Sequence, residues 1–146
     1  MSTSPRPIHF LLVESNPADS YLMVEGLRRA GLSEAVTVVE DSEQALDQLS
    51  SQISPDLIFL DLNLTPMSGL DLLGRIRVHP HCATVPVIII SGSQNRDDVR
   101  KAYEFGANCY ITKPSSLDEF FTFMKISYDF WSSVATLPPR PAVGGN

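Results

Sequence analysis

Short apolar runs alternate with amphipathic segments along the whole chain. Each run is nearly continuous in Val, Ile, Leu and Phe, which is typical of strands in a parallel sheet that is covered on both faces. The runs that we interpret as strands span residues 8–13, 35–40, 56–60, 86–90 and 109–111.

Helix-start signals stand between these runs. A short polar side chain is followed three residues later by Asp, Glu or Gln at Asn16, Asp41, Ser68 and Ser116, and Pro17 adds a proline at a first helical position. Strand and helix therefore alternate five times. This order predicts an α/β fold with a doubly wound, five-stranded parallel sheet.

The length of 146 residues suits one domain with one core. We expect an N-terminal tail over residues 1–7 and a folded domain over residues 8–132. Residues 133–146 contain the Pro-rich stretch Leu137-Pro-Pro-Arg-Pro141 and the pair Gly144-Gly145, which predicts a flexible C-terminal tail.

Composition narrows the function classes. The net charge is −6 and no basic stripe is visible, so we expect neither nucleic acid nor a membrane surface as a partner. No apolar run approaches the length of a membrane span or a signal peptide, which favours a cytoplasmic protein. Cys82 and Cys109 are interpreted as free thiols, and His79, His81 and Cys82 as loop residues.

Polar side chains follow the predicted strands at the points where the strands end. Ligands of doubly wound sheets bind at the carboxyl ends of the strands, so these residues are candidates for one common pocket. Acids, a hydroxyl and a lysine in one pocket suit a divalent cation and a phosphoryl group. Asp56, which begins a run, is interpreted as a turn or cap residue. The candidate pocket residues are Glu14, Ser15, Asp61, Asn63, Ser91 and Lys113.

Five motifs in order resemble those of response-regulator receiver domains, which have the flavodoxin-like (βα)5 fold. The resemblance runs from about Ile8 to Trp131. The absence of an output domain, together with Asn16-Pro-Ala-Asp19 and Asp129-Phe-Trp131, is similar to a single-domain subgroup that includes partners of bacterial phytochrome kinases. The motifs are Leu12-Val-Glu-Ser-Asn-Pro-Ala-Asp19, Leu57-Ile-Phe-Leu-Asp-Leu-Asn63, Met67-Ser-Gly69, Pro86-Val-Ile-Ile-Ile-Ser-Gly92 and Gly106-Ala-Asn-Cys-Tyr-Ile-Thr-Lys-Pro114.

The resemblance implies a role for each matching residue. Asp61 would accept a phosphoryl group from a sensor histidine kinase, Ser91 would bond a phosphoryl oxygen, and Lys113 would pair with the phosphoryl group. Gly92 would leave room beside Ser91. Tyr110 would be the switch aromatic, which turns inward when Ser91 moves. The family also implies a cis peptide bond between Lys113 and Pro114.

The same resemblance implies a Mg²⁺ site formed by Glu14, Asp61 and the backbone carbonyl of Asn63. The family usually has a second acid after Glu14, where this chain has Ser15. A hydroxyl can accept a metal bond but brings no charge, so whether Ser15 is a ligand stays open and Mg²⁺ binding is expected to be weak. The family also usually has Pro where this chain has Thr65, a difference that concerns loop shape.

Three hypotheses follow. The first is a working phosphoreceiver, which is not an enzyme beyond self-catalysed phosphoryl transfer and autodephosphorylation. The second is a pseudo-receiver, a binding module that acts without phosphorylation because Ser15 replaces a metal-binding acid. The third is an unrelated flavodoxin-like enzyme, against which the lack of a phosphate-binding loop after the first strand argues.

The last predicted helix carries an apolar face that is wider than one core requires. Phe123, Ile126 and Phe130 lie beside the main face and widen it. Because monomers rarely expose wide apolar patches, this width predicts a homodimer built on the C-terminal helix. The alternative is that the C-terminal tail covers the patch. The main face consists of Leu117, Phe120, Phe121, Met124, Tyr128 and Trp131.

Overall fold

The computed structural model describes residues 8–32, 36–51 and 54–140, and within them strands and helices alternate five times. The strands are β1 (Phe10–Val13), β2 (Thr37–Val39), β3 (Leu57–Leu60), β4 (Val87–Ser91) and β5 (Cys109–Thr112). The helices are α1 (Pro17–Ala30), α2 (Ser42–Leu49), α3 (Gly69–Val78), α4 (Arg96–Glu104), α5 (Leu117–Asp129) and the π-helical turn η1 (Phe130–Val134).

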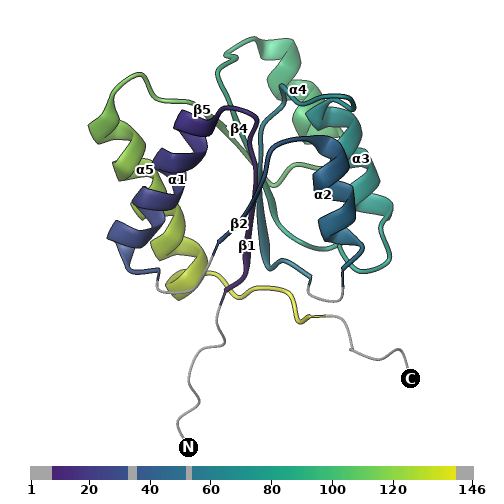
Figure 1. Cartoon of the computed structure of the whole chain (residues 1–146), viewed down its shortest axis with the longest axis horizontal. Coiled ribbons are helices and arrows are strands. Elements are labelled where there is room, and N and C mark those ends of the chain that lie inside the picture. The colour runs from purple at the N-terminus through teal and green to yellow at the C-terminus, as the bar shows by residue number, and fades with distance from the viewer. Residues whose placement is uncertain (1–7, 33–35, 52–53, 141–146) are drawn as a thin grey trace, which may run out of the picture.

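The five strands form one parallel sheet in the order β2-β1-β3-β4-β5. Helices α1 and α5 cover one face of the sheet, and α2, α3 and α4 cover the other (Figure 1). The predicted doubly wound α/β fold is therefore confirmed. The order reverses between β1 and β3, which places a ligand-binding crevice at the carboxyl ends of these two strands.

Each central strand contributes to two hydrophobic cores because its side chains alternate between the faces. In β1, Leu11 and Val13 pack on the side of α2 and α3, whereas Phe10 and Leu12 pack on the side of α1 and α5. The strands β3 and β4 alternate in the same way. This double burial explains why the strands are continuously apolar in the sequence.

Four of the five strands begin one or two residues later than the apolar runs predicted, and β5 begins at Cys109 as predicted. Ile8 is buried but precedes β1, and the run predicted from Ala35 begins pairing only at Thr37. Ala35 itself lies outside the described residues. An apolar residue indicates that its side chain is buried, not that its backbone pairs with a neighbouring strand. The apolar runs therefore extend beyond the residues that form the sheet hydrogen bonds.

The four predicted helix starts are confirmed, because each cap side chain accepts a hydrogen bond from a backbone N–H of the first turn. Asn16 caps α1, Asp41 caps α2, Ser68 caps α3 and Ser116 caps α5. Each cap satisfies donors that have no partner within the helix. The caps fix the positions at which the chain leaves the carboxyl edge of the sheet.

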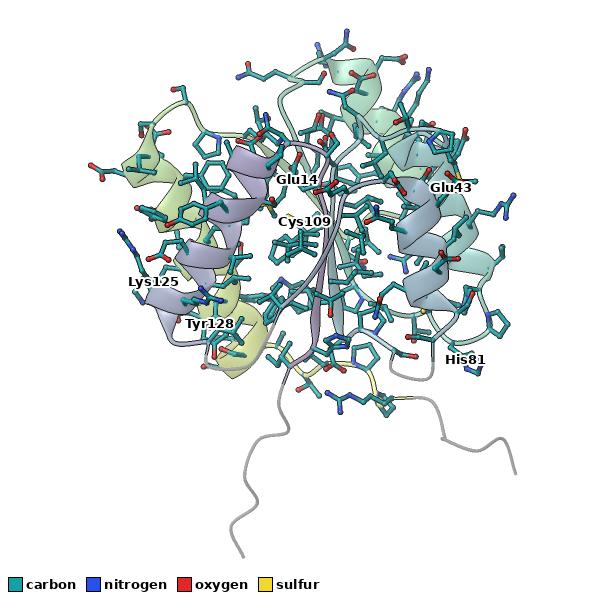
Figure 2. All side chains as sticks on the ribbon, viewed as in Figure 1. Glu14, Glu43, His81, Cys109, Lys125 and Tyr128 are labelled. Atoms are coloured by element: carbon teal, nitrogen blue, oxygen red, sulfur yellow. The ribbon has the colours of Figure 1, made fainter. Side chains whose placement is uncertain are left out.

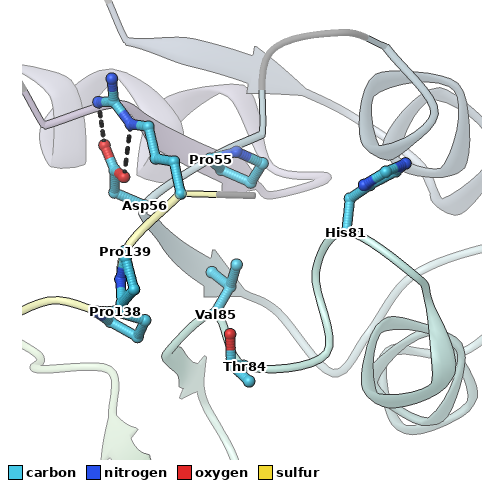
Figure 3. A pocket seen from close by; sticks show the side chains of 8 residues that line it. Pro55, Asp56, His81, Thr84, Val85, Pro138 and Pro139 are labelled. Atoms are coloured by element: carbon cyan, nitrogen blue, oxygen red, sulfur yellow. Dashed lines mark hydrogen bonds and ion pairs between the residues drawn. The ribbon is translucent and has the colours of Figure 1, made fainter. Parts of the chain in front are cut away.

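The described part of the segment expected to be a tail contacts the domain. After η1, residues 135–140 run back along the edge at which the strands begin, and Leu137 packs on the core shared by α1 and α5. The Arg140 guanidinium donates to both carboxylate oxygens of Asp56, at 2.9 and 2.5 Å (Figure 3). The predicted ends at residues 1–7 and 141–146 lie outside the described residues.

Asp56 is more than the turn or cap residue that the sequence suggested. Its side chain is only 2% exposed, and besides Arg140 it accepts a hydrogen bond of 2.8 Å from the backbone N–H of His9. A buried carboxylate needs such partners, because an unpaired buried charge costs several kcal/mol. Asp56 thus joins the N-terminal end of the sheet to the last described turn of the chain.

Other sequence predictions concern loops and thiols. Cys82 is buried, Cys109 is half-buried, and both are free thiols as predicted. His79 and His81 lie in the turn before β4, and His81 is at the end of the molecule away from Glu14 (Figure 2). Among the described residues, no helix combines the length and apolar character needed to cross a membrane.

Candidate phosphoacceptor site

The candidate residues lie at one edge of the sheet because parallel strands present their carboxyl ends together. Glu14 follows β1, Asp61 follows β3, Ser91 ends β4 and Lys113 follows β5. Figure 2 shows Glu14 at this edge, above the neighbouring strands. Glu14, Asp61 and Ser91 are each less than 5% exposed, so the pocket is buried beneath the loops that follow the strands.

Lys113 is the centre of the charged cluster. Its ammonium nitrogen lies 3.0 Å from Glu14 Oε1, 2.8 Å from Asp19 Oδ2 and 3.6 Å from Asp61 Oδ2. The Lys113 backbone N–H also donates to the carbonyl of Ser91 at 2.7 Å, which extends the pairing of β4 with β5. The structure therefore brings Glu14, Asp61 and Lys113 together.

Asp19 was missed as a pocket residue in the sequence. Its pattern Asn16-Pro-Ala-Asp19 indicated only a helix start, and the Asn16 side chain does accept hydrogen bonds from the N–H groups of Ala18 and Asp19. The signal that could have found it is its place in the first turn of α1. That turn rises directly from the end of β1 and faces Lys113.

The crowding of acids changes the pKa of Glu14. Burial, together with the hydrogen bond to and the negative charge of Asp61, raises the pKa of Glu14 from 4.5 to about 7. Burial lowers the pKa of Lys113, but hydrogen bonds to Asp19 and Glu14 outweigh it and the net effect raises the pKa. The pocket therefore keeps its ammonium group charged while one carboxyl group holds a proton near neutral pH.

This shift predicts a pH dependence of stability for the metal-free protein. Folded Glu14 binds its proton more tightly than in the unfolded chain, so its stabilising contribution is complete below about pH 4.5 and is lost as the pH rises through about 7. Urea unfolding between about pH 5 and pH 8 measures this. In Glu14→Gln that part of the decline should vanish; an equally steep decline in the variant would contradict the assignment.

The loop after β3 closes over Asp61. The backbone N–H of Asn63 donates to Asp61 Oδ1 at 3.1 Å, and the carbonyl of Asn63 accepts a hydrogen bond of 3.2 Å from the Ser15 hydroxyl. Ser15 thus stands at the rim of the pocket, beside the carbonyl that was expected to bind metal. Ser42 holds the far side of the loop, because its hydroxyl accepts from the Met67 N–H at 2.9 Å.

Gly69 sets how closely this loop returns to Asp61. A Cβ atom at Gly69 would lie 2.3 Å from the Asp61 carbonyl oxygen and 2.6 Å from the Cα of Leu62. Both are backbone atoms that cannot swing away. Only glycine fits there, and the Met67-Ser-Gly69 motif owes its last residue to this contact.

Ser91 and Tyr110 are linked through the loop after β4. The Ser91 hydroxyl accepts a hydrogen bond from the Ser93 N–H, and the Tyr110 hydroxyl donates to the Ser93 carbonyl at 2.8 Å. Tyr110 is half-buried and packs against the core, so it occupies an inward position. Ser91 and Tyr110 are thus joined by hydrogen bonds to the same residue, Ser93.

The expected cis bond between Lys113 and Pro114 is wrong. Among the described residues the cis peptide bond is Thr65–Pro66, in the loop after β3, and Lys113–Pro114 is trans. The trans form is the default for an X–Pro bond, and Lys113 reaches the pocket from it.

The pocket combines features suited to phosphoryl transfer. Two buried carboxylates and a backbone carbonyl offer hard oxygen ligands, and an ammonium group beside Asp61 can neutralise phosphoryl charge. Among the described residues, no group of three or more His, Cys, Asp or Glu side chains is arranged to hold a metal ion. Fold and pocket together define the class of phosphoacceptor signalling domains.

The chain belongs to the response regulator receiver domain family, whose model matches residues 10–125. Response regulator Rcp1 of Synechocystis sp. is 35% identical over 143 residues, which cover 94% of this chain and 96% of the relative. The Mn²⁺-bound form of Rcp1 superimposes with a TM-score of 0.83 at 34% identity, covering 91% of this chain and 100% of the other.

A second solved structure is similar over the same region. The phosphorylated cyanobacterial phytochrome response regulator RcpA gives a TM-score of 0.85 at 36% identity and covers 92% of this chain and 100% of the other. The bacteriophytochrome response regulator RtBRR gives a TM-score of 0.71 at 34% identity, with 92% and 86% coverage. The predicted family and its single-domain, phytochrome-related likeness are confirmed.

Proposed function

We propose that Asp61 accepts a phosphoryl group from the phosphohistidine of a sensor kinase. The observation that carries this proposal is the Lys113 ammonium group 3.6 Å from the buried Asp61 carboxylate. A carboxylate oxygen of Asp61 attacks phosphorus, the new P–O bond forms, and the P–N bond to the kinase histidine breaks. Lys113 and Ser91 then bond oxygens of the phosphoryl group.

Divalent metal binding belongs to this proposal. Glu14, Asp61 and the Asn63 carbonyl would hold Mg²⁺, and their hard oxygen donors suit that ion. When bound, Mg²⁺ neutralises the repulsion between the Asp61 carboxylate and an incoming phosphoryl group. The existence of a Mn²⁺-bound form of the relative Rcp1 supports the binding of a divalent cation.

The direct test is incubation with acetyl phosphate and Mg²⁺, followed by mass spectrometry of the intact protein. We expect a gain of one phosphoryl group and its loss after hydroxylamine treatment, which cleaves acyl phosphates. A protein that gains nothing from acetyl phosphate, or from a phosphorylated histidine kinase, would overturn the proposal and favour the pseudo-receiver. The pseudo-receiver alternative rests on Ser15, which brings no charge to the metal site.

The choice of kinase partner is supported by the relatives rather than by the pocket. RcpA and RtBRR carry phytochrome in their names, and both are similar to this chain over most of its length. We therefore propose a phytochrome-like sensor histidine kinase as the phosphoryl donor, in the cytoplasm. Phosphoryl transfer from a purified phytochrome kinase, faster than from an unrelated kinase, would support this partner.

We expect Ser15→Asp to strengthen Mg²⁺ binding, because it adds a carboxylate beside the Asn63 carbonyl. Phosphorylation at low millimolar Mg²⁺ should also become faster. The added acid increases repulsion in the empty pocket, so the metal-free variant should be slightly less stable. Titration of Mg²⁺ by calorimetry compares the two proteins, with Ser15→Ala as the uncharged control. Equal affinities would show that Ser15 replaces the acid fully.

A homodimer through α5 is the second part of the proposal. Part of the predicted patch is covered, because Phe123 packs against Phe120 with tilted rings and is half-buried, whereas Ile126 and Phe130 are 63% and 45% exposed. These two side chains border an apolar groove of about 500 Å³ between α5 and the edge strand β5. A second copy related by a two-fold axis would cover the groove on both chains.

We expect Phe130→Asp to weaken this dimer by at least tenfold, since it places a charge in an apolar contact. Sedimentation or light scattering across a concentration series measures the dissociation constant. Val134→Asp, which is exposed in η1 outside the groove lining, is the control with the same added charge. A wild-type protein that stays monomeric at high concentration, with or without phosphorylation, would refute the dimer.

A further inference from the structure

Asp19 contributes a carboxylate to the pocket from helix α1, and not from the end of a strand. It stands in the first turn of α1, and its Oδ2 atom accepts a hydrogen bond of 2.8 Å from the Lys113 ammonium group. This is the shortest of the three carboxylate contacts of Lys113. The side chain of Asp19 is 24% exposed, so it lies at the mouth of the pocket, above the buried Glu14.

The number of charged groups in the pocket indicates what the contact between Asp19 and Lys113 does. Ser15 leaves the position after Glu14 without a carboxylate, and its hydroxyl is engaged with the Asn63 carbonyl. With Asp19 included, the pocket holds three carboxylates and one ammonium group. That is the count that an acid at position 15, together with Glu14, Asp61 and Lys113, would give.

We propose that Asp19 is a positioning residue that supplies the carboxylate missing at Ser15. It holds the Lys113 ammonium group beside Asp61, and its charge adds to the attraction of the pocket for Mg²⁺. Asp19 acts through Lys113 and through the field of its charge, and it is not a metal ligand. The inference deepens the proposed phosphoacceptor function and rests on it.

The holding role follows from the geometry of Lys113. A lysine side chain has about four rotatable bonds and loses much conformational entropy when it is fixed in one place. Glu14 and Asp61 contact the ammonium group only from the buried part of the pocket, at 3.0 and 3.6 Å. Asp19 provides a second anchor outside that crowded pair, and α1 fixes it through the Asn16 cap.

The test compares Asp19→Asn with Asp71→Asn in the full chain. Both residues are third in their helices, after the caps Asn16 and Ser68, so both variants lose the same charge at a helix N-terminus. Asp71 is exposed in α3. Calorimetric titration of Mg²⁺ into the unphosphorylated proteins is the first readout, and the rate of phosphorylation by acetyl phosphate at fixed Mg²⁺ is the second.

We expect Asp19→Asn to bind Mg²⁺ about threefold to tenfold more weakly, the effect of one screened charge near the cation, and to be phosphorylated more slowly. Asp71→Asn should match the wild type. In the Ser15→Asp background the same Asp19→Asn change should weaken Mg²⁺ binding less than it does in the wild type, because the acid at position 15 then supplies the carboxylate. A merely structural role of Asp19 would give equal losses in the two backgrounds.

The outcomes separate the two levels of the proposal. A phosphorylated wild type whose Asp19→Asn variant is indistinguishable from Asp71→Asn overturns the role of Asp19 alone. Equal losses of Mg²⁺ affinity on Asp19→Asn in the wild type and in Ser15→Asp, in folded proteins, also overturn it. A wild type that neither binds Mg²⁺ nor takes up a phosphoryl group overturns the proposed function, and the role of Asp19 falls with it.

Discussion

Asp61→Asn will take up no phosphoryl group from acetyl phosphate or from a histidine kinase. The amide has no anionic oxygen to attack phosphorus, and no other acid in the pocket has the same relation to Lys113, because Glu14 and Asp19 each lie within 3.0 Å of its ammonium group and are engaged with it. Intact-mass spectrometry should show complete loss of the phosphorylated species. Asp71→Asn, which changes an exposed acid of α3, should be phosphorylated at the wild-type rate.

The same variant has a second expected effect that does not involve phosphorylation. Since Asp61 contributes to the raised pKa of Glu14, its neutralisation should lower the pKa of that carboxyl group toward its ordinary value. The metal-free variant should therefore lose less stability than the wild type between about pH 5 and pH 8. A residual phosphoryl signal in Asp61→Asn would assign the acceptor to another residue.

Gly69→Ala will damage the site through the backbone rather than through charge. The new methyl group would overlap the Asp61 carbonyl oxygen and the Leu62 Cα, so the loop after β3 must move away from Asp61. We expect a loss of about 1–3 kcal/mol in the free energy of unfolding, the usual cost of overpacking, together with slower phosphorylation. Chemical unfolding and the acetyl phosphate reaction measure the two effects.

Gly74→Ala is the matched control in the same helix. An added Cβ at Gly74 would meet only the Phe105 ring, at an ordinary contact distance of 4.0 Å. Alanine is favoured over glycine inside a helix, so this variant should gain about 0.5–1 kcal/mol in stability and keep normal phosphorylation. Equal behaviour of the two alanine variants would show that the close approach at Gly69 does not govern the site.

The fold could be predicted from the sequence because its signals are local. Continuous apolar runs such as residues 86–90 indicate strands that are buried on both faces, and Asn16 or Ser68 indicates a helix start through its own side chain. The positions of Glu14, Asp61 and Lys113 at the sheet edge follow from these elements. The roles assigned to them came from the resemblance to receiver domains and await the experiments above.

The contacts that escaped prediction join residues far apart in the chain. Asp19 meets Lys113 only because α1 and the loop after β5 rise side by side from the sheet, and this depends on strand order. Similarly, the buried carboxylate of Asp56 is stabilised by an ion pair with Arg140, which lies far away in the sequence. A sequence pattern shows neither partner, because both pairings are set by tertiary packing.

The pairing of Asp56 with Arg140 also has a consequence for the order of folding. It joins residues that are 84 positions apart, and its carboxylate is buried only once β3 lies in the sheet and α5 has docked. Closing so long a loop early would cost entropy without any compensating contact. We therefore expect the pair to form after the rate-limiting step of folding, so that it slows unfolding without speeding folding.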